Sequence, residues 1–95
     1  MSNTMPGGWT AFSFTIPGDA KHVFDKALEG FTGVGYTPLA VATQVVEGTN
    51  YCYLCKGVVV YPGAPELVVK MYIYKPLDGS PHITQIVEIR PEHGM

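Results

Sequence analysis

The most reactive side chains in this 95-residue chain are two thiols, Cys52 and Cys55, spaced as Cys-x-x-Cys. Such a pair can act in redox chemistry or supply half of a zinc site, provided that it lies in a loop or at a helix start and that further ligands exist. The surrounding residues 51–60 are instead typical of a β-strand, on which residues three apart point to opposite faces. No second Cys pair is present. We therefore predict structural thiols in a reducing compartment, with no disulfide, metal or cofactor.

Acid–base chemistry has no evident centre in the sequence. The acidic residues are scattered over predicted loops and polar faces: Asp19, Asp25, Glu29, Glu47, Glu66, Asp78, Glu88 and Glu92. His22, His82 and His93 fall on a helix surface, at a strand start and in the tail. No nucleophile has an acid and a base placed beside it by a motif, and no glycine-rich phosphate loop precedes a helix. We predict that the protein is not an enzyme.

The composition argues against two classes of partner. Six Lys and Arg against eight Asp and Glu give a net charge of -2, so there is no electrostatic footprint for a nucleic acid or an anionic membrane. No apolar run reaches the roughly 18 residues that a membrane span requires, and the N-terminus lacks the basic and apolar segments of a signal peptide. We expect a single domain over residues 1–95, in the cytoplasm unless a leader has been removed.

Residues 43–51, with the sequence Thr-Gln-Val-Val-Glu-Gly-Thr-Asn-Tyr, are the strongest candidate for a binding element. Strand-like runs flank them, so we expect a hairpin tip over residues 47–50, where Gly48 accepts a positive φ and Asn50 tolerates turn geometry. Val45 and Val46 adjoin the tip with no polar residue between them. At least one of these valines should face solvent, which is a liability unless something binds there.

This stretch also carries a family resemblance. Gln44, Val45, Val46, Glu47 and Gly48 resemble the Gln-x-Val-x-Gly first binding loop of the cystatins, which are protein inhibitors of papain-like cysteine proteases. The match is closest to the stefin branch, and the resemblance spans roughly residues 6–89. It implies a cystatin fold and an inhibitor that fills the protease cleft without delivering a peptide bond to the catalytic cysteine.

The N-terminal residues 5–9, Met-Pro-Gly-Gly-Trp, are similar to the Pro-Gly-Gly trunk of some stefins. In that family the trunk lies along the non-primed side of the cleft, which implies the same role for Gly7 and Gly8, because a residue without Cβ permits close approach. The residues themselves favour a flexible trunk over residues 1–8, matched by a flexible tail over residues 91–95. An ordinary frayed terminus is the alternative.

Periodicity predicts the elements that position these segments. Residues 10–16 alternate between polar and apolar, which indicates a first strand with Phe12, Phe14 and Ile16 on one face. After Pro17 the period changes, and one amphipathic helix is expected, ending near Gly30. Its apolar stripe is Val23, Phe24, Ala27, Leu28 and Phe31. Asp19 is expected either to cap this helix or to lie at the positive end of its dipole.

The remaining residues predict strands that each offer one apolar face to the helix. The predicted inward residues are Leu39, Val41 and Val45, then Tyr51, Tyr53 and Cys55, then Val69, Met71 and Ile73, and finally Ile83, Gln85, Val87 and Ile89. Turn-forming residues at 61–66 and 76–81 connect neighbouring strands antiparallel. The predicted fold class is α+β, with one helix packed on a curved four- to five-stranded antiparallel sheet.

The resemblance extends to a second binding hairpin, because residues 69–76 are similar to the stefin strand that enters it. Lys75 and Pro76, followed by Leu77, stand where stefins carry Leu-Pro. The trunk and the two hairpins would then form one apolar wedge at one end of the sheet. The protease-binding residues that the resemblance implies are Gly7, Gly8, Gln44, Val45, Val46, Glu47, Gly48, Lys75, Pro76 and Leu77.

The second hypothesis is an interaction or oligomerisation module without inhibitory activity. Apolar residues also occupy the strand positions opposite the helix: Leu54, Val58, Val60, Val68, Tyr72, Tyr74 and Ile86. Such a face could bury against a second copy of the chain. The stefin resemblance implies another route to a homodimer, domain swapping through the first hairpin, which would hide the wedge.

Overall fold

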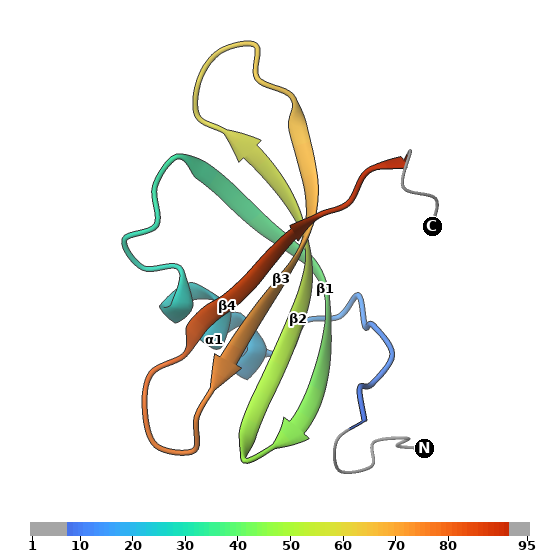
Figure 1. The fold of residues 1–95 in the computed structure, drawn as a ribbon, viewed down its shortest axis with the longest axis vertical. Helices are drawn as coiled ribbons and strands as arrows, with labels where there is room; N and C mark the ends of the chain where they lie inside the picture. Colours follow the sequence, from blue (N-terminus) through green and yellow to red (C-terminus); the bar gives the residue numbers. More distant parts are fainter. Residues whose placement is uncertain (1–7, 92–95) are drawn as a thin grey trace.

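The computed structural model describes residues 8–91 as one helix packed on one face of a four-stranded antiparallel sheet (Figure 1). The elements are α1 (Gly18–Ala27), β1 (Val34–Val46), β2 (Gly48–Val59), β3 (Glu66–Lys75) and β4 (His82–Glu88). The strand order is β1-β2-β3-β4, so each strand pairs with its neighbour in sequence. The predicted α+β class and its antiparallel meander are confirmed. The predicted flexible trunk and tail fall almost entirely outside the described residues.

The helix begins and ends where the local sequence changes. Pro17 is the residue before α1, and Asp19 lies in the first turn. The Asp19 carboxylate accepts a hydrogen bond from the Ala20 N–H at 2.9 Å, so Asp19 acts as an acid at the positive end of the dipole and not as the cap residue. The turns after Ala27 lead to Gly30, whose φ of 79° suits glycine and ends the helix.

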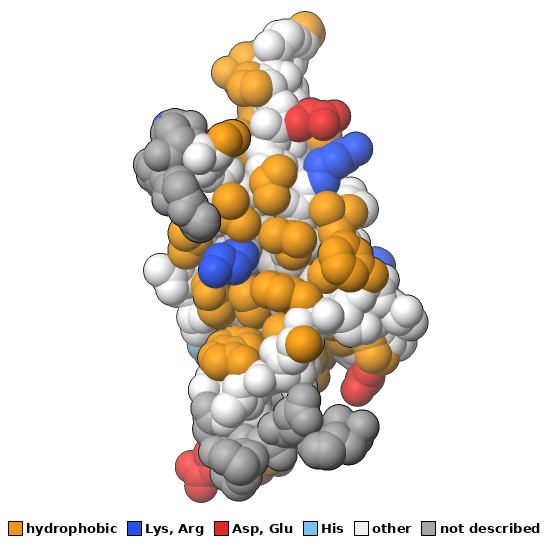
Figure 2. All heavy atoms as spheres, turned by 90° about the vertical axis from the view of Figure 1, so that its right-hand side faces the viewer, with side chains coloured by type: hydrophobic (Ala, Val, Ile, Leu, Met, Phe, Trp, Pro, Cys, Tyr) orange, Lys and Arg blue, Asp and Glu red, His pale blue; other side chains and the backbone are white. Residues whose placement is uncertain are grey.

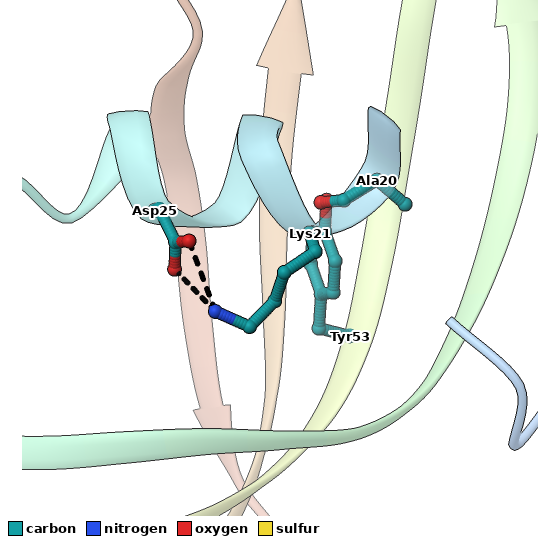
Figure 3. A network of polar contacts seen from close by, with 4 residues as sticks. All are labelled: Ala20, Lys21, Asp25 and Tyr53. Carbon is teal, nitrogen blue, oxygen red and sulfur yellow. Dashed lines mark hydrogen bonds and ion pairs between the residues drawn. The ribbon is translucent and has the colours of Figure 1, made fainter. Parts of the chain in front are cut away.

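The core lies between α1 and the inner face of the sheet. Its buried residues are Ala20, Val23, Phe24, Val41, Tyr53, Cys55, Val69, Met71 and Ile73. Tyr53 is fully buried, and its hydroxyl donates a hydrogen bond to the Ala20 carbonyl at 2.7 Å (Figure 3). Burial raises the pKa of the Tyr53 hydroxyl, which therefore stays protonated and can donate. The same figure shows an exposed pair, Lys21 and Asp25 at 2.7 Å, which contributes only a few tenths of a kcal/mol.

Two β-bulges explain where the inward-facing prediction was wrong. In β1 the register shifts between Pro38 and Ala40, so that Leu39 is exposed while Val41 points into the core. In β4 the shift leaves Thr84 unpaired, because Ile73 pairs with Ile83 while Tyr72 pairs with Gln85. One inserted residue moves every later side chain to the other face. Downstream of this bulge, Ile86 therefore faces the helix side opposite Met71. Gln85, Val87 and Ile89 face away, contrary to the prediction.

The segment before α1 does not form the predicted first strand. In its described part, residues 8–17, it pairs with β1 through two isolated bridges, Trp9 with Gln44 and Ser13 with Val41. Phe12 and Phe14 are exposed, whereas Ile16 packs against the core. The two bridges are one residue out of register with each other, so the residues between them form no continuous ladder with β1.

The two thiols lie on opposite faces of β2, as predicted. Cys55 belongs to the core beneath α1, and Cys52 faces the other side opposite Tyr72. Both are free and buried. Burial is the main cause that raises the pKa of each thiol, to about 12 for Cys55, so neither forms a ready thiolate. Within residues 8–91 there is also no group of three or more His, Cys, Asp or Glu side chains that could hold a metal ion.

The single helix of the described part, α1, has ten residues. A membrane-spanning helix needs about twice that length, and no helix among residues 8–91 is long and apolar enough to cross a bilayer.

Candidate functional site

The first hairpin is tighter than the sequence suggests. β1 ends at Val46 and β2 begins at Gly48, so Glu47 alone forms the apex. Gly48 adopts the predicted positive φ, at 101°. Asn50, in contrast, lies within β2 and pairs with Gln44, so the prediction that residues 47–50 form the turn was too long. The Asn50 side-chain amide donates a hydrogen bond to Gln44 Oε1 at 2.8 Å, which ties the two strands together just below the apex.

Both valines of this hairpin are exposed, as expected for at least one of them. Val45 is 49% exposed and Val46 is 42% exposed. Val45 pairs with Thr49 and Val46 pairs with Gly48, so the two side chains leave the hairpin on opposite faces. The apex therefore presents apolar surface on both sides of a narrow backbone.

Gly48 also packs closely against the second hairpin. A Cβ atom placed on Gly48 would lie 2.5 Å from the backbone oxygen of Lys75 and 3.1 Å from Pro76 Cα. Real Cβ atoms essentially never show a contact as short as the 2.5 Å one, and the contact with Pro76 is also tight. Glycine is thus required at position 48 for two reasons, its positive φ and the contact between the two hairpins.

A hydrogen bond joins the same two hairpins. The Tyr74 hydroxyl donates to the backbone oxygen of Glu47, at the apex of the first hairpin. In the second hairpin, Lys75 Nζ donates to the Pro76 backbone oxygen at 2.8 Å, and Leu77 is 72% exposed. The two hairpin tips therefore lie side by side at one end of the sheet (Figure 1).

The N-terminal segment reaches the same end along the outer edge of β1. Trp9 bridges to Gln44, and the Thr10 N–H donates to the Thr43 backbone oxygen at 2.9 Å. The Trp9 ring contacts Tyr72 edge-on, with ring centroids 6.0 Å apart. Gly8 precedes Trp9 directly and is half-buried, whereas Gly7 lies outside the described residues.

We call this end of the molecule the tip edge: residues 8–9, residues 44–48 of the first hairpin and residues 75–78 of the second. It brings together nine of the ten predicted site residues: Gly8, Gln44, Val45, Val46, Glu47, Gly48, Lys75, Pro76 and Leu77. Its charged side chains are Glu47, Lys75 and Asp78, and none forms an ion pair with another described residue. The edge is therefore largely apolar, with two exposed carboxylates at the two tips.

Tyr74 and Trp9 had no predicted binding role, although both help to build the tip edge. Tyr74 becomes visible only once the register is known, because its position opposite Asn50 lets its ring reach the apex. Trp9 follows the glycines of the trunk, and its contact with Tyr72 depends on the path of the N-terminal segment over the sheet. A large aromatic residue directly after a glycine pair was the available signal.

Comparisons of this chain with protein-family models, with curated proteins and with solved structures give no match.

Proposed function

We propose that the protein inhibits papain-like cysteine proteases by inserting the tip edge into the active-site cleft. The trunk side of the edge would lie along the non-primed side of the cleft, and the two hairpins would block the catalytic centre and the primed side. The catalytic cysteine and histidine of such an enzyme need a substrate carbonyl delivered in line. A hairpin apex that fills the cleft without presenting a peptide bond there prevents turnover.

The contact between the two hairpins is the observation that supports this proposal most. Because Gly48 packs against Lys75 and Tyr74 binds the Glu47 carbonyl, the two tips are held in a fixed relation before any partner arrives. Preorganisation lowers the entropic cost of binding, so a contact of modest area can be tight. The exposed side chains of Val45 and Val46 would then contribute about 25 cal/mol for each Å² of apolar surface removed from water.

The apex residue narrows the choice of target. Glu47 is exposed, and its carboxylate has no ion pair with a described residue. Burial of an unpaired carboxylate is costly. The proposed target therefore leaves Glu47 in water or offers it a cation.

Residual activity of papain or a cathepsin, measured against rising protein concentration, tests the proposal. We expect a dose-dependent loss of activity for the wild-type chain and a much weaker loss for Val46→Asp, because the variant carries a charge into the cleft. Val60→Asp is the matched control, since Val60 is 72% exposed and follows β2 at the opposite end of the sheet. Full protease activity at micromolar protein, or equal potency of Val46→Asp and wild type, would contradict the proposal.

A module that binds without inhibiting is the second candidate function. It is favoured by the exposed apolar residues on the side of the sheet away from α1, which the tip edge does not use. A module of this kind would leave the activity of the protease unchanged, whether or not it bound the protease. Measurements of protease activity and of protease binding together therefore separate the two candidates.

A further inference from the structure

The side of the sheet away from α1, here called the outer face, is apolar across its middle. Trp9 and Phe12 line a cavity on this face beside Lys70 and Tyr72. The apolar residues of the face outside that cavity include Leu54, Val58, Val68, Val87 and Ile89. Figure 2 shows hydrophobic side chains gathered over this side of the molecule, with few charged side chains among them. Val68, near the middle of the group, is 44% exposed. Contiguous exposed apolar surface on a folded domain marks an interaction site.

Three charged side chains from the paired strands share this face: Lys56, Glu66 and Lys70. Lys56 and Glu66 lie 3.9 Å apart on β2 and β3. Lys70 pairs across the ladders with Leu54 and Val87, and it forms no ion pair with any described residue. A cation among apolar side chains that lacks an acidic neighbour is suited to a carboxylate from a partner.

Glu66 and Lys70 are placed symmetrically about Val68 on the same strand. Each lies two residues from Val68, so all three side chains point to the outer face, and the two charges are about 13 Å apart along β3. Consider a two-fold axis that passes beside Val68, between two facing sheets and perpendicular to β3. It would place the Glu66 of one copy opposite the Lys70 of the other. We infer that the outer face binds the outer face of a second copy of this chain, with the two β3 strands antiparallel and each Lys70 against the Glu66 of the other copy.

The charges select this arrangement over the other symmetric one. If the two sheets were stacked with their β3 strands parallel, each Lys70 would face Lys70 and each Glu66 would face Glu66, which is unfavourable. Two sheets that pack face to face keep their strands within about 30° of alignment. A shallow groove of about 430 Å³ lined by Val68, Ile89, Arg90 and Pro91 gives the face a recess for an apolar side chain of the other copy.

This pairing is independent of the proposed inhibitory function. With the strands antiparallel, the two tip edges point in opposite directions, away from the shared face. Each copy therefore keeps its hairpin tips accessible, and the assembly would carry two equivalent edges. A domain-swapped dimer, in contrast, opens the first hairpin.

Sedimentation velocity on the full chain, from micromolar to millimolar concentration, tests the inference. We expect a reversible dimer for wild type, and at least about tenfold weaker association for Lys70→Glu and for Glu66→Lys, because each places like charges in contact. The double variant Lys70→Glu/Glu66→Lys should regain the wild-type association. Lys70→Gln should fall between wild type and Lys70→Glu. Lys56 pairs with Val68, so in the proposed dimer it lies near the Lys56 of the other copy, and the two like charges repel. Lys56→Gln should therefore strengthen the dimer.

Lys26→Glu is the matched control for charge reversal, because Lys26 lies on the exposed side of α1 with Glu29 at 3.6 Å. This variant should associate as wild type does, and circular dichroism should show that every variant is folded. A wild-type chain that stays monomeric at millimolar concentration would overturn the inference. So would a dimer that is insensitive to Lys70→Glu, as expected for domain swapping, or a double variant that does not recover.

Discussion

The two hairpins at opposite ends of β2 use glycine in different ways. Gly48 and Gly63 both have a positive φ, at 101° and 82°. A Cβ on Gly48 would overlap the Lys75 backbone, whereas a Cβ on Gly63 would meet nothing within 4 Å. A positive φ by itself indicates a turn, but crowding around the glycine indicates that two segments are built to stay together. Only the first hairpin shows both features.

The polar contacts are also closer and more buried at the tip edge than at the other end of β2. At the tip edge the Gln44–Asn50 hydrogen bond of 2.8 Å is part-buried, and Tyr74 joins the two hairpins. At the other end, the nearest cross-strand polar pair is Lys56 with Glu66, which is exposed and 3.9 Å apart. Solvent-exposed ion pairs contribute little, about 0–1 kcal/mol. The tip edge is therefore expected to be the more rigid end.

Alanine at the two glycines should show the largest difference between the ends. Gly48→Ala is expected to lower the free energy of unfolding by about 3 kcal/mol or more, because it adds an overlap with backbone to the strain of the positive φ. Gly63→Ala should lower it by about 1 kcal/mol, from the φ alone. Denaturant unfolding of both variants measures this difference. Equal losses would mean that the two hairpins are not locked together.

Removal of one tyrosine hydroxyl should have a smaller effect. Tyr74→Phe loses the hydrogen bond to the Glu47 carbonyl, so the free energy of unfolding should fall by about 1 kcal/mol. The proposed inhibition should also weaken, because the two tips would no longer be held in place. Tyr61→Phe is the control, since Tyr61 is exposed in the opposite turn and no change is expected. If the two variants behave alike in thermal unfolding, the Tyr74 contact has no energetic role.

Double-mutant cycles should reveal a still smaller contrast. For Gln44→Ala with Asn50→Ala, we expect a coupling free energy of about 0.5–1 kcal/mol from the part-buried hydrogen bond. For Lys56→Ala with Glu66→Ala, the coupling should be below about 0.5 kcal/mol and should fall further at high salt. Unfolding at low protein concentration, where self-association does not contribute, gives both values. A stronger coupling for the Lys56 pair would reverse the comparison.

Alkaline pH should lower the free energy of unfolding through two buried groups in the middle of the sheet, whereas pH changes near neutrality should have no effect through them. Burial raises the pKa of Cys55 from 9.0 to about 12, and it raises the pKa of Tyr53 as well. The folded chain thus holds these protons more tightly than the unfolded chain does. The free energy of unfolding should be constant up to about pH 9 and should fall as the pH rises toward 12. Urea unfolding across this range checks the sign, and a rise in stability above pH 9 would contradict it.

The sequence was sufficient for much of the fold because its periodic segments also form the core. The alternation of Val69, Met71 and Ile73 and the stripe of Val23 and Phe24 predict their burial correctly. The bulges at Leu39 and Thr84 were not predictable, because a bulge leaves no mark on the apolar pattern except an apparent defect. Gln85, predicted to face inward, was such a defect.

In the candidate site, too, local features were predictable from the sequence and long-range contacts were not. The exposure of at least one hairpin valine and the positive φ of Gly48 were predicted from residue type and neighbours. The exposure of Val45, predicted to face the helix, was not. The contacts of Tyr74 and Trp9 were not, since each joins segments far apart in the sequence through a register that local pattern does not define. Local propensity describes a hairpin well, but not what lies next to it.

The bulge in β4 has a consequence for assembly. β4 is an edge strand, and an unprotected edge can recruit the strands of other molecules without limit. The extra residue at Thr84 interrupts the regular spacing of backbone N–H and C=O groups along β4, so an incoming strand cannot keep one register along the whole edge. Growth of the sheet into a fibre by strand addition at β4 is therefore disfavoured.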